Sequence, residues 1–197
     1  MRALQLVLKR LLDVAASLAV LLLGLPLFVL IAILVKLSSP GPVLFIQERV
    51  GRGGRPFRLL KFRSMALPPP GYQPSGWSEA EEARVTRIGR FLRSYGLDEL
   101  PQAVNILKGD MSIVGPRPPL PSAAERYSAR QRKVFDVRPG VVALAAIKGR
   151  RAISMEERIE LHVQYVERWS LWLDLQILIR SIGVILRREG AVERTNA

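Results

Sequence analysis

The longest uninterrupted apolar stretch of the chain runs from Val14 to Val35. Its 22 residues include no charged side chain, and fifteen of them are Val, Leu, Ile or Phe. A helix that is apolar on every face over this length is typical of membrane insertion rather than of a soluble core. The stretch is too long for a signal-peptide h-region, and no small-residue cleavage site follows it. We therefore predict that it inserts into a membrane.

A proline lies near the middle of this segment. A straight helix of 22 residues would be about 33 Å long and could cross a hydrocarbon core of ~30 Å. Pro26, however, has no backbone N–H to donate, and the halves Val14–Leu25 and Leu27–Val35 would be only about 18 and 13 Å long. Ser17 is a candidate to bond the carbonyl that Pro26 leaves free.

Basic residues flank the segment on both sides, whereas a spanning helix normally has one basic side and one poor in basic residues. The simplest arrangement is a re-entrant helix that enters the membrane, bends at Pro26 and returns to the same face. A kinked span remains the alternative. The flanking basic residues are Arg2, Lys9 and Arg10 before the segment and Lys36, Arg49, Arg52 and Arg55 after it.

A small β-hairpin is predicted after the segment. Val43–Gln47 and Phe57–Phe62 are the expected strands, and the loop Gly51–Pro56 links them. The turn-rich stretch Ser38–Pro42 leads out of the membrane. Ala66–Gly76 contains three consecutive prolines, which favours a mobile excursion without regular structure.

Helices are predicted over much of the remaining chain. Ser78 and Glu81 fit a capping box that begins a helix, and Gly96 is expected to end it. A short helix should follow from Glu99 to Leu107, before an extended loop at Gly115–Pro119. The first of these helices carries the apolar stripe Val85, Ile88, Leu92 and Tyr95.

A third helix begins with the capping box Ser154 and Glu157. His162 borders its apolar stripe and is predicted to pack rather than to take part in chemistry. The segment Trp169–Leu186 is apolar but contains Asp174, and Trp favours the membrane–water boundary, so this helix is expected on the membrane surface. A helix on a soluble core is the alternative. The stripe of the third helix is Met155, Ile159, Val163 and Val166.

These elements predict an α+β fold that is mostly helical. It combines an N-terminal re-entrant membrane helix–break–helix, a small β-hairpin, and several amphipathic and interfacial helices. We expect residues 1–37 to form the membrane anchor and residues 38–197 to form a cytoplasmic, membrane-associated catalytic domain.

The charge and the residue counts limit the partners and the kinds of catalytic site that the chain can have. The chain has 30 basic and 17 acidic residues, a net charge of +13, and 24 of the basic residues are arginine. This surplus indicates a polyanionic partner such as nucleic acid, anionic lipid or a diphosphate substrate. The chain has no cysteine and a single histidine, which excludes disulfides, thiolate catalysis and His-rich metal sites.

The carboxylates of greatest interest are Asp98 and Glu99, at the predicted start of the short helix. A helix N-terminus favours anions and should keep a carboxylate ionised. An ionised Asp can act as a nucleophile or bind Mg²⁺, although Asp is also a common N-cap. The cations Lys61, Arg93 and Arg117 could stabilise charge on a phosphate attacked there.

Several sequence blocks resemble the bacterial monotopic phosphoglycosyl transferases, and they occur in the order of that family from about residue 9 to 188. The most specific run lies between Asp98 and Pro118. The blocks are Ser39-Pro40-Gly41-Pro42, Gln47-x-Arg49-Val50-Gly51, Lys61-Phe62-Arg63-Ser64-Met65, Asp98-Glu99-Leu100-Pro101-Gln102, Asn105-Ile106-Leu107-Lys108-Gly109-Asp110-Met111-Ser112 and Val114-Gly115-Pro116-Arg117-Pro118.

The resemblance implies transfer of a sugar-1-phosphate from a UDP-sugar to a polyprenol phosphate, with release of UMP. It implies a covalent phosphosugar intermediate, a requirement for Mg²⁺, and a place on the cytoplasmic face of the bacterial inner membrane among anionic lipids. Asp98 would be the nucleophile and Mg²⁺ ligand, with Glu99 as its catalytic partner. The substrate- and phosphate-binding set would be Lys61, Arg63, Arg93, Arg117, Arg150 and Asp174.

Two departures from the family pattern stand out. Leu25 precedes Pro26 where the family often has serine, which removes a hydroxyl from the bend. The residues at 142–148 differ from the Thr, Trp, Gln and Asn that the family usually has after Arg138-Pro139-Gly140, so the identity of the donor sugar cannot be inferred from the family.

Two rival interpretations are a non-catalytic membrane scaffold and a membrane-tethered nucleic-acid binder, and we expect no nucleic-acid partner. The oligomeric state is left open.

Overall fold

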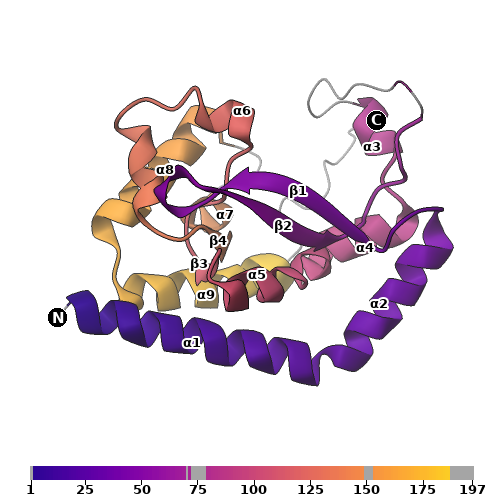
Figure 1. Cartoon of the computed structure of the whole chain (residues 1–197), viewed down its shortest axis with the longest axis horizontal. Coiled ribbons are helices and arrows are strands. Elements are labelled where there is room, and N and C mark those ends of the chain that lie inside the picture. Colours follow the sequence, from indigo (N-terminus) through magenta and orange to yellow (C-terminus); the bar gives the residue numbers. More distant parts are fainter. Residues whose placement is uncertain (1, 70, 72–78, 149–152, 187–197) are drawn as a thin grey trace.

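The structure is a computed structural model that describes residues 2–69, 71, 79–148 and 153–186 (Figure 1). The longer helices are α1 (Arg2–Leu23), α2 (Leu25–Ser38), α4 (Arg87–Tyr95), α5 (Gln102–Lys108), α8 (Met155–Arg168) and α9 (Leu171–Leu186). Shorter helical segments are α3 (Glu79–Ala83), α6 (Pro121–Ala124), α7 (Leu144–Ile147) and the 3-10 turns η1 (Arg52–Gly54), η2 (Leu97–Glu99) and η3 (Gln131–Asp136). The strands are β1 (Leu44–Val50), β2 (Pro56–Phe62), β3 (Ser112–Val114) and β4 (Gly140–Val142).

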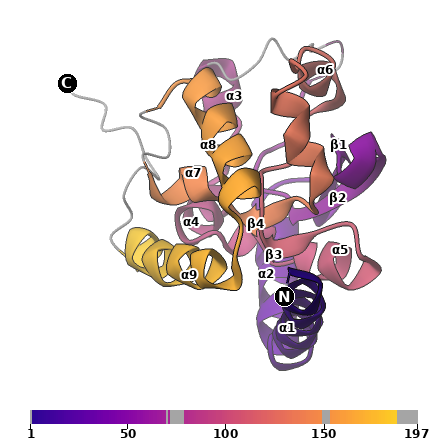
Figure 2. The same ribbon diagram turned by 90° about the vertical axis from the view of Figure 1, so that its left-hand side faces the viewer.

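The strands form two small sheets. β1 and β2 are antiparallel, from the pair Leu44 and Phe62 to the pair Val50 and Pro56 at the turn. The mostly helical α+β fold with a small hairpin is therefore confirmed. The parallel pair of β3 and β4, central in Figure 2, was not predicted. The two backbones meet so closely at Gly115 and Gly140 that a Cβ on either glycine would collide with the other strand.

The N-terminal apolar segment forms two helices rather than one. No single helix among the described residues is long and apolar enough to span a membrane, but α1 and α2 pass that test together and are bent by 64°. The bend lies at Gly24, where a Cβ would collide with the carbonyl oxygen of Val20. Pro26 then lies in the first turn of α2, where its missing N–H costs little. Ser17 does not satisfy the bend as expected, because its Oγ is buried and has no hydrogen-bond partner within the described residues.

Polar side chains attach the N-terminal half of α1 to the rest of the protein. The Arg10 guanidinium donates to the carbonyls of Ile106 and Leu107, at 2.7 and 3.1 Å, near the end of α5. The buried Asp13 carboxylate accepts a 3.0 Å bond from the Ile113 backbone N–H in β3. These contacts hold α1 beneath α5, along the lower edge of Figure 1.

The other end of the bent pair is attached to the same body. Ile31 and Val35 of α2 are buried in a cluster with Phe62 and Leu92, which come from β2 and α4. Phe28 meets Phe62 edge-on, with ring centroids 5.5 Å apart. The bent pair therefore has both of its ends fixed to one packed unit.

The predicted helix from Ser78 to Gly96 is wrong as a single element. It is two helices, α3 and α4, because Val85 pairs as an isolated antiparallel bridge with Met65 and interrupts the helix. Thr86 then caps α4, and its side chain accepts from the Gly89 N–H. The predicted capping residue Ser78, and residues 72–76 of the predicted excursion, lie outside the described residues.

The last two long helices cover one side of the small sheets. The predicted capping box of α8 is confirmed, since Ser154 and Glu157 bond to each other's backbone. Ile159, Val163 and Val166 are buried as predicted, but Met155 is 61% exposed and does not join that face. In α9 an outward stripe of four apolar side chains is exposed, as an interfacial helix requires. This stripe is Trp172, Leu175, Ile179 and Ile182.

Candidate active site

A tight turn between α4 and α5 carries the two acidic residues Asp98 and Glu99. Gly96 ends α4 in the left-handed conformation, with φ at 69°, which L-residues adopt only at a cost. η2 follows at once, and Pro101 precedes α5. This segment, Gly96–Pro101, is called the Asp98 turn below. Its geometry places two adjacent carboxylates beside the hairpin.

Glu99 is held by two cations from different elements. Its Oε1 accepts from Lys61 Nζ of β2 at 2.9 Å and from Arg117 at 3.1 Å. Burial disfavours the charged carboxylate, but the Arg117 and Lys61 charges outweigh it and lower the pKa of Glu99 to about 2. Glu99 is therefore ionised at every physiological pH.

Asp98 has the opposite electrostatic character. Its carboxylate is buried, with the residue 7% exposed, and it accepts no hydrogen bond from the described part of the chain. Burial and the neighbouring Glu99 charge raise the pKa of Asp98, although Lys61 and Arg93 oppose them. The expected lowering by a helix N-terminus is not found, because Asp98 lies in a 3-10 turn before Pro101 and not in the first turn of α5. The Asp98 carboxylate is thus poorly solvated.

Arg93, one turn before Gly96, lies beside the same acids. Its Nε donates to Ser64 Oγ at 2.9 Å and its NH2 contacts Met65 Sδ at 3.4 Å. Because the Arg93 charge acts on the pKa of Asp98, the guanidinium is within electrostatic reach of that carboxylate. The structure therefore brings together Asp98, Glu99, Lys61, Arg93 and Arg117, as the sequence predicted.

A further arginine of this site was not predicted. Arg49 of β1 donates twice to Gln47 Oε1, at 3.1 and 2.6 Å, and once to the Pro118 carbonyl at 3.1 Å. Burial and the Arg117 charge lower the pKa of Arg49 to about 10, while Glu99 raises it. Arg49 thus braces the loop that carries Arg117. The Gln47-x-Arg49 block was a usable signal, but it was read only as a family pattern and not as part of the site.

Comparisons with known proteins identify the family of this chain. A sequence profile described as bacterial sugar transferase matches residues 4–188. This chain belongs to the bacterial sugar transferase family. One relative of this bacterial sugar transferase is the UDP-glucose:undecaprenyl-phosphate glucose-1-phosphate transferase of Caulobacter vibrioides, 42% identical over 93% of this chain and 71% of that protein.

Two further relatives differ in length. An uncharacterised sugar transferase of Bacillus subtilis, EpsL, is 40% identical over 96% of this chain and 92% of its own length. The UDP-glucose:undecaprenyl-phosphate glucose-1-phosphate transferase of Escherichia coli is 40% identical over 89% of this chain, which spans 39% of that protein. The family's shared region therefore corresponds to nearly all of this bacterial sugar transferase.

Two residues of the predicted substrate-binding set, Arg63 and Asp174, lie in other groups of side chains than Asp98. Arg63 is buried, and its guanidinium donates to the carbonyls of Pro40 and Ser39, both at 2.6 Å, and of Val35 at 3.3 Å. In this structure the Arg63 guanidinium therefore attaches the end of α2 to β2 and is not grouped with the cations around Asp98. Arg150 lies outside the described residues.

Asp174 lies in a different group of side chains, called the Asp174 cluster below. Its carboxylate accepts from Lys9 Nζ at 2.6 Å, from the Tyr165 hydroxyl at 2.7 Å and from Trp169 Nε1 at 3.2 Å. Lys9 and Tyr165 also donate to the Val114 carbonyl, at 3.0 and 3.1 Å. Asp174 therefore joins α1, α8 and α9 to the end of β3, three residues before Arg117.

His162 is buried in α8, as the packing prediction requires. Burial and the charges of Arg117 and Arg158 lower its pKa to about 4, so the imidazole is neutral at physiological pH. Its Nδ1 has no hydrogen-bond partner within the described residues. The neutral imidazole therefore adds no positive charge near Arg117.

The acids of the site suit one mode of metal binding. Within residues 2–69, 71, 79–148 and 153–186, no group of three or more His, Cys, Asp or Glu side chains is arranged to hold a metal ion. Magnesium, however, is commonly bound by one or two carboxylates together with substrate phosphates and water. Asp98, whose oxygens accept no bond from the described residues, fits that mode.

Proposed function

We propose that this bacterial sugar transferase moves a sugar-1-phosphate from a UDP-sugar to a polyprenol phosphate. The names of the Caulobacter and Escherichia relatives describe this reaction with UDP-glucose and undecaprenyl phosphate. The observation that carries the proposal in this chain is the Asp98 turn. It combines a buried carboxylate that accepts no hydrogen bond from the described residues with a neighbouring acid fixed between two cations. The donor sugar is left open.

Asp98 is the proposed nucleophile. One of its Oδ atoms forms a bond to the phosphorus that carries the sugar, and the bond from that phosphorus to UMP breaks, so UMP leaves with the electron pair. An oxygen of the polyprenol phosphate then attacks the same phosphorus and releases Asp98 as a carboxylate. Burial raises the free energy of the ionised carboxylate before attack, which favours the first step.

The surrounding cations stabilise the phosphate charge. Arg117 is 45% exposed at its side chain and can bind a phosphate oxygen while its NH2 stays near Glu99. Arg93 and Lys61 act on Asp98 from two other elements. Glu99 keeps Lys61 and Arg117 in place, which makes it a positioning residue in this proposal. Each cation offsets the repulsion between the attacking carboxylate and the diphosphate.

The proposal includes Mg²⁺ as the cofactor. The residue that would hold it is Asp98, together with oxygens of the diphosphate. When bound, magnesium supplies positive charge that neutralises the phosphate oxygens. The chain's own residues orient the diphosphate and exclude water from the Asp98 turn.

We further propose that α1 and α2 form a re-entrant anchor on the cytoplasmic face of the bacterial inner membrane. Both ends of the bent pair are fixed to one packed unit, Arg10 beneath α5 and Arg63 at the end of α2. This supports a return to the same membrane face. A site on that unit then lies near the headgroups, where the phosphate of a polyprenol lipid is located.

The activity is tested by UMP release. The full chain in detergent is given a panel of UDP-sugars, polyprenol phosphate and Mg²⁺. Asp98→Asn should lower turnover by at least about a thousandfold, because the amide cannot attack phosphorus. Asp136→Asn, a change at an exposed acid, is the matched control and should keep full turnover. Near-full turnover of Asp98→Asn would exclude the nucleophile assignment.

The covalent step has its own readout. Without acceptor, intact-protein mass spectrometry should detect an adduct with the mass of the phosphosugar on the wild type and on Asp136→Asn, but not on Asp98→Asn. Release of UMP without any adduct would favour direct transfer between the two substrates.

The re-entrant geometry is tested by labelling. The chain has no cysteine, so Gln5→Cys and Ser38→Cys each give one reactive thiol. In oriented membranes both should react with an impermeant maleimide from the cytoplasmic side alone. Reaction from opposite sides would show that the pair spans the membrane.

A further inference from the structure

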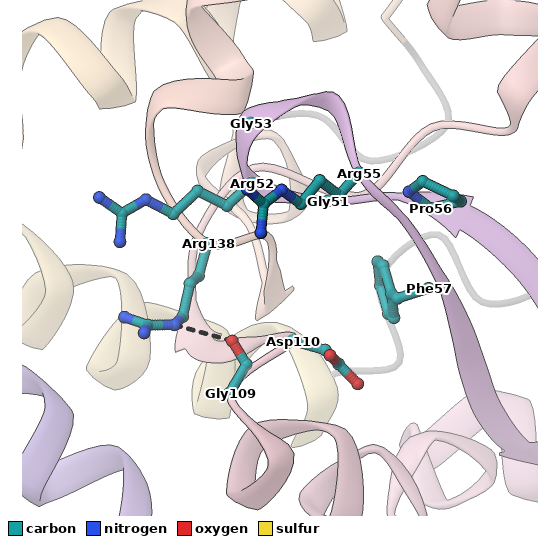
Figure 3. A pocket seen from close by; sticks show the side chains of 9 residues that line it. All are labelled: Gly51, Arg52, Gly53, Arg55, Pro56, Phe57, Gly109, Asp110 and Arg138. Atoms are coloured by element: carbon teal, nitrogen blue, oxygen red, sulfur yellow. Dashed lines mark hydrogen bonds between the residues drawn. The ribbon is translucent and has the colours of Figure 1, made fainter.

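A cavity of about 510 Å³ lies at the turn of the β-hairpin, apart from the Asp98 turn. None of the residues that line it belongs to the group around Asp98 and Glu99. Its lining residues, drawn in Figure 3, are Gly51, Arg52, Gly53, Arg55, Pro56, Phe57, Gly109, Asp110 and Arg138. We call it the arginine cavity.

Three arginines from two distant segments line the arginine cavity. Arg52 and Arg55 come from the hairpin turn, and Arg138 comes from the segment that leads to β4. Figure 3 shows the Arg52 and Arg138 guanidinium groups on the same side of the cavity. Burial lowers the pKa of Arg138, and the charges of Arg10 and Arg52 lower it further. Like charges are therefore held within electrostatic reach of one another.

Among the described residues, two acids lie near these charges: Asp13, whose charge raises the pKa of Arg138, and Asp110. Asp110 is the one acid in the lining, and its carboxylate points away from Arg52 and Arg138 in Figure 3 and accepts a 3.4 Å bond from Asn105. Arg138 donates from Nε to the Gly109 carbonyl at 2.8 Å, which leaves its other N–H groups for a ligand. Arg52 and Arg55 form no salt bridge in the part of the chain that the structure describes.

Such a group of cations costs folding free energy unless an anion binds to it. The planar guanidinium fork suits phosphate oxygens, which accept two parallel N–H bonds. Pro56 and Phe57 add an apolar wall to the same cavity, which fits the organic part of a phosphate ester better than a bare inorganic ion.

We propose that the arginine cavity is a second phosphate-binding site, for a phosphate group esterified to an organic molecule. Arg52, Arg55 and Arg138 bind the phosphate oxygens, and Phe57 contacts the ester. The phosphate belongs either to a phospholipid headgroup of the membrane in which α1 is anchored or to a soluble phosphate ester. The site is independent of Asp98, and it does not require the proposed transfer reaction.

The test measures arginine modification site by site. The full chain in dodecyl maltoside and phosphate-free buffer is treated with phenylglyoxal, and the modified arginines are identified by peptide mass spectrometry. One arm adds glycerol 3-phosphate, and the other adds phosphatidylglycerol to the micelles, both at matched ionic strength. At ten times the Kd, modification of Arg52 and Arg55 should slow roughly tenfold, because about a tenth of the sites stay empty. Arg87 and Arg126, which are exposed elsewhere, are the internal controls and should be unaffected.

Every outcome bears on the proposal. Protection in the glycerol 3-phosphate arm alone assigns the site to soluble esters, protection in the phosphatidylglycerol arm alone assigns it to lipid, and protection in both arms supports the shared chemistry. No protection in either arm, or equal protection of Arg87 and Arg126, would overturn the proposal.

Variants test the site directly. Arg138→Ala should abolish protection of Arg52, whereas Arg126→Ala should not. UMP release by Arg52→Ala is measured in the same detergent, because it separates this site from the Asp98 turn. It should stay within about twofold of the wild type.

Discussion

The Asp98 turn and the Asp174 cluster each contain a buried aspartate, and both aspartates were predicted as site residues. The Asp174 carboxylate accepts from Lys9, Tyr165 and Trp169. The Asp98 carboxylate accepts from no described residue, and its cations bond to Glu99 instead. Both carboxylates are buried, but only that of Asp174 accepts hydrogen bonds from described residues.

This difference separates structural acids from reactive ones. A buried carboxylate that is fully bonded stabilises the elements that supply its donors, and its removal leaves those donors unpaired. A buried carboxylate without donors destabilises the folded protein and is retained for what it binds or attacks. Asp174 therefore attaches α1 and supports the Arg117 loop, whereas the features of Asp98 agree with its proposed role as nucleophile.

The largest effect on stability is expected from Asp174→Asn. The change leaves Lys9 as a buried charge without its partner, which typically costs about 3–5 kcal/mol of unfolding free energy. Thermal unfolding in detergent, followed by circular dichroism, should show a clear fall in the melting temperature. Asp136→Asn is the matched control. An unchanged melting temperature would contradict the structural role of Asp174.

Glu99→Gln should have the next largest effect on the free energy of unfolding, and the size of this effect should depend on pH. Because the pKa of Glu99 is lowered to about 2, its ion pairs contribute stability above the ordinary Glu range that is lost as the pH falls towards 2. The wild type should therefore exceed Glu99→Gln by roughly 2–3 kcal/mol at pH 7, and the difference should shrink at acid pH. Melting temperatures between pH 3 and 7, taken with about one-unit steps, measure it. A difference that does not change with pH would mean that Glu99 is not held by charge.

Asp98→Asn should change stability in the opposite direction. Folding raises the pKa of Asp98, so the ionised form destabilises the folded protein once the pH rises above the ordinary Asp range. Asp98→Asn should therefore melt at a higher temperature than the wild type at pH 7, and the gain should disappear as the pH falls below that range. A lower melting temperature at pH 7 would show that Asp98 is a structural acid like Asp174.

Tyr165→Phe is the mildest test of the comparison. It removes the hydroxyl that donates to Asp174 at 2.7 Å but leaves Lys9 and Trp169 in place. We expect a loss of about 1 kcal/mol in unfolding free energy. The double variant Tyr165→Phe with Asp174→Asn should lose less than the sum of the two single changes, because both remove the same bond. Additive losses would show that the two residues are not coupled.

Local signals in the sequence predicted much of the fold. Gly96 and Gly109 end their helices in the left-handed conformation, and Ser154 and Glu157 form their capping box. These features are set within a few residues, so a single sequence contains them. The break at Val85 is set by Met65, twenty residues away, and no local pattern shows that pairing.

The candidate site was predicted only in part, because it too depends on contacts between residues that are distant in the sequence. The family blocks identify which basic residues matter, but not where each guanidinium points. Arg63 and Arg49 both lie in such blocks, yet Arg63 binds carbonyls at the end of α2 and Arg49 braces Pro118 beside the acids. Strand register and loop closure decide these directions, and both depend on residues distant in the sequence.

The ion pair between Lys9 and Asp174 also sets an order of events during synthesis. The two residues are separated by 165 positions, so α1 leaves the ribosome long before its partner exists. Until then Lys9 lacks this carboxylate, although the Val114 carbonyl to which it also donates has already been made. The contact between Lys9 and Asp174 is thus the last of those that attach α1 to be completed. A chain truncated before α9 should keep the contacts of Arg10 and Asp13 but lose this support of the Arg117 loop.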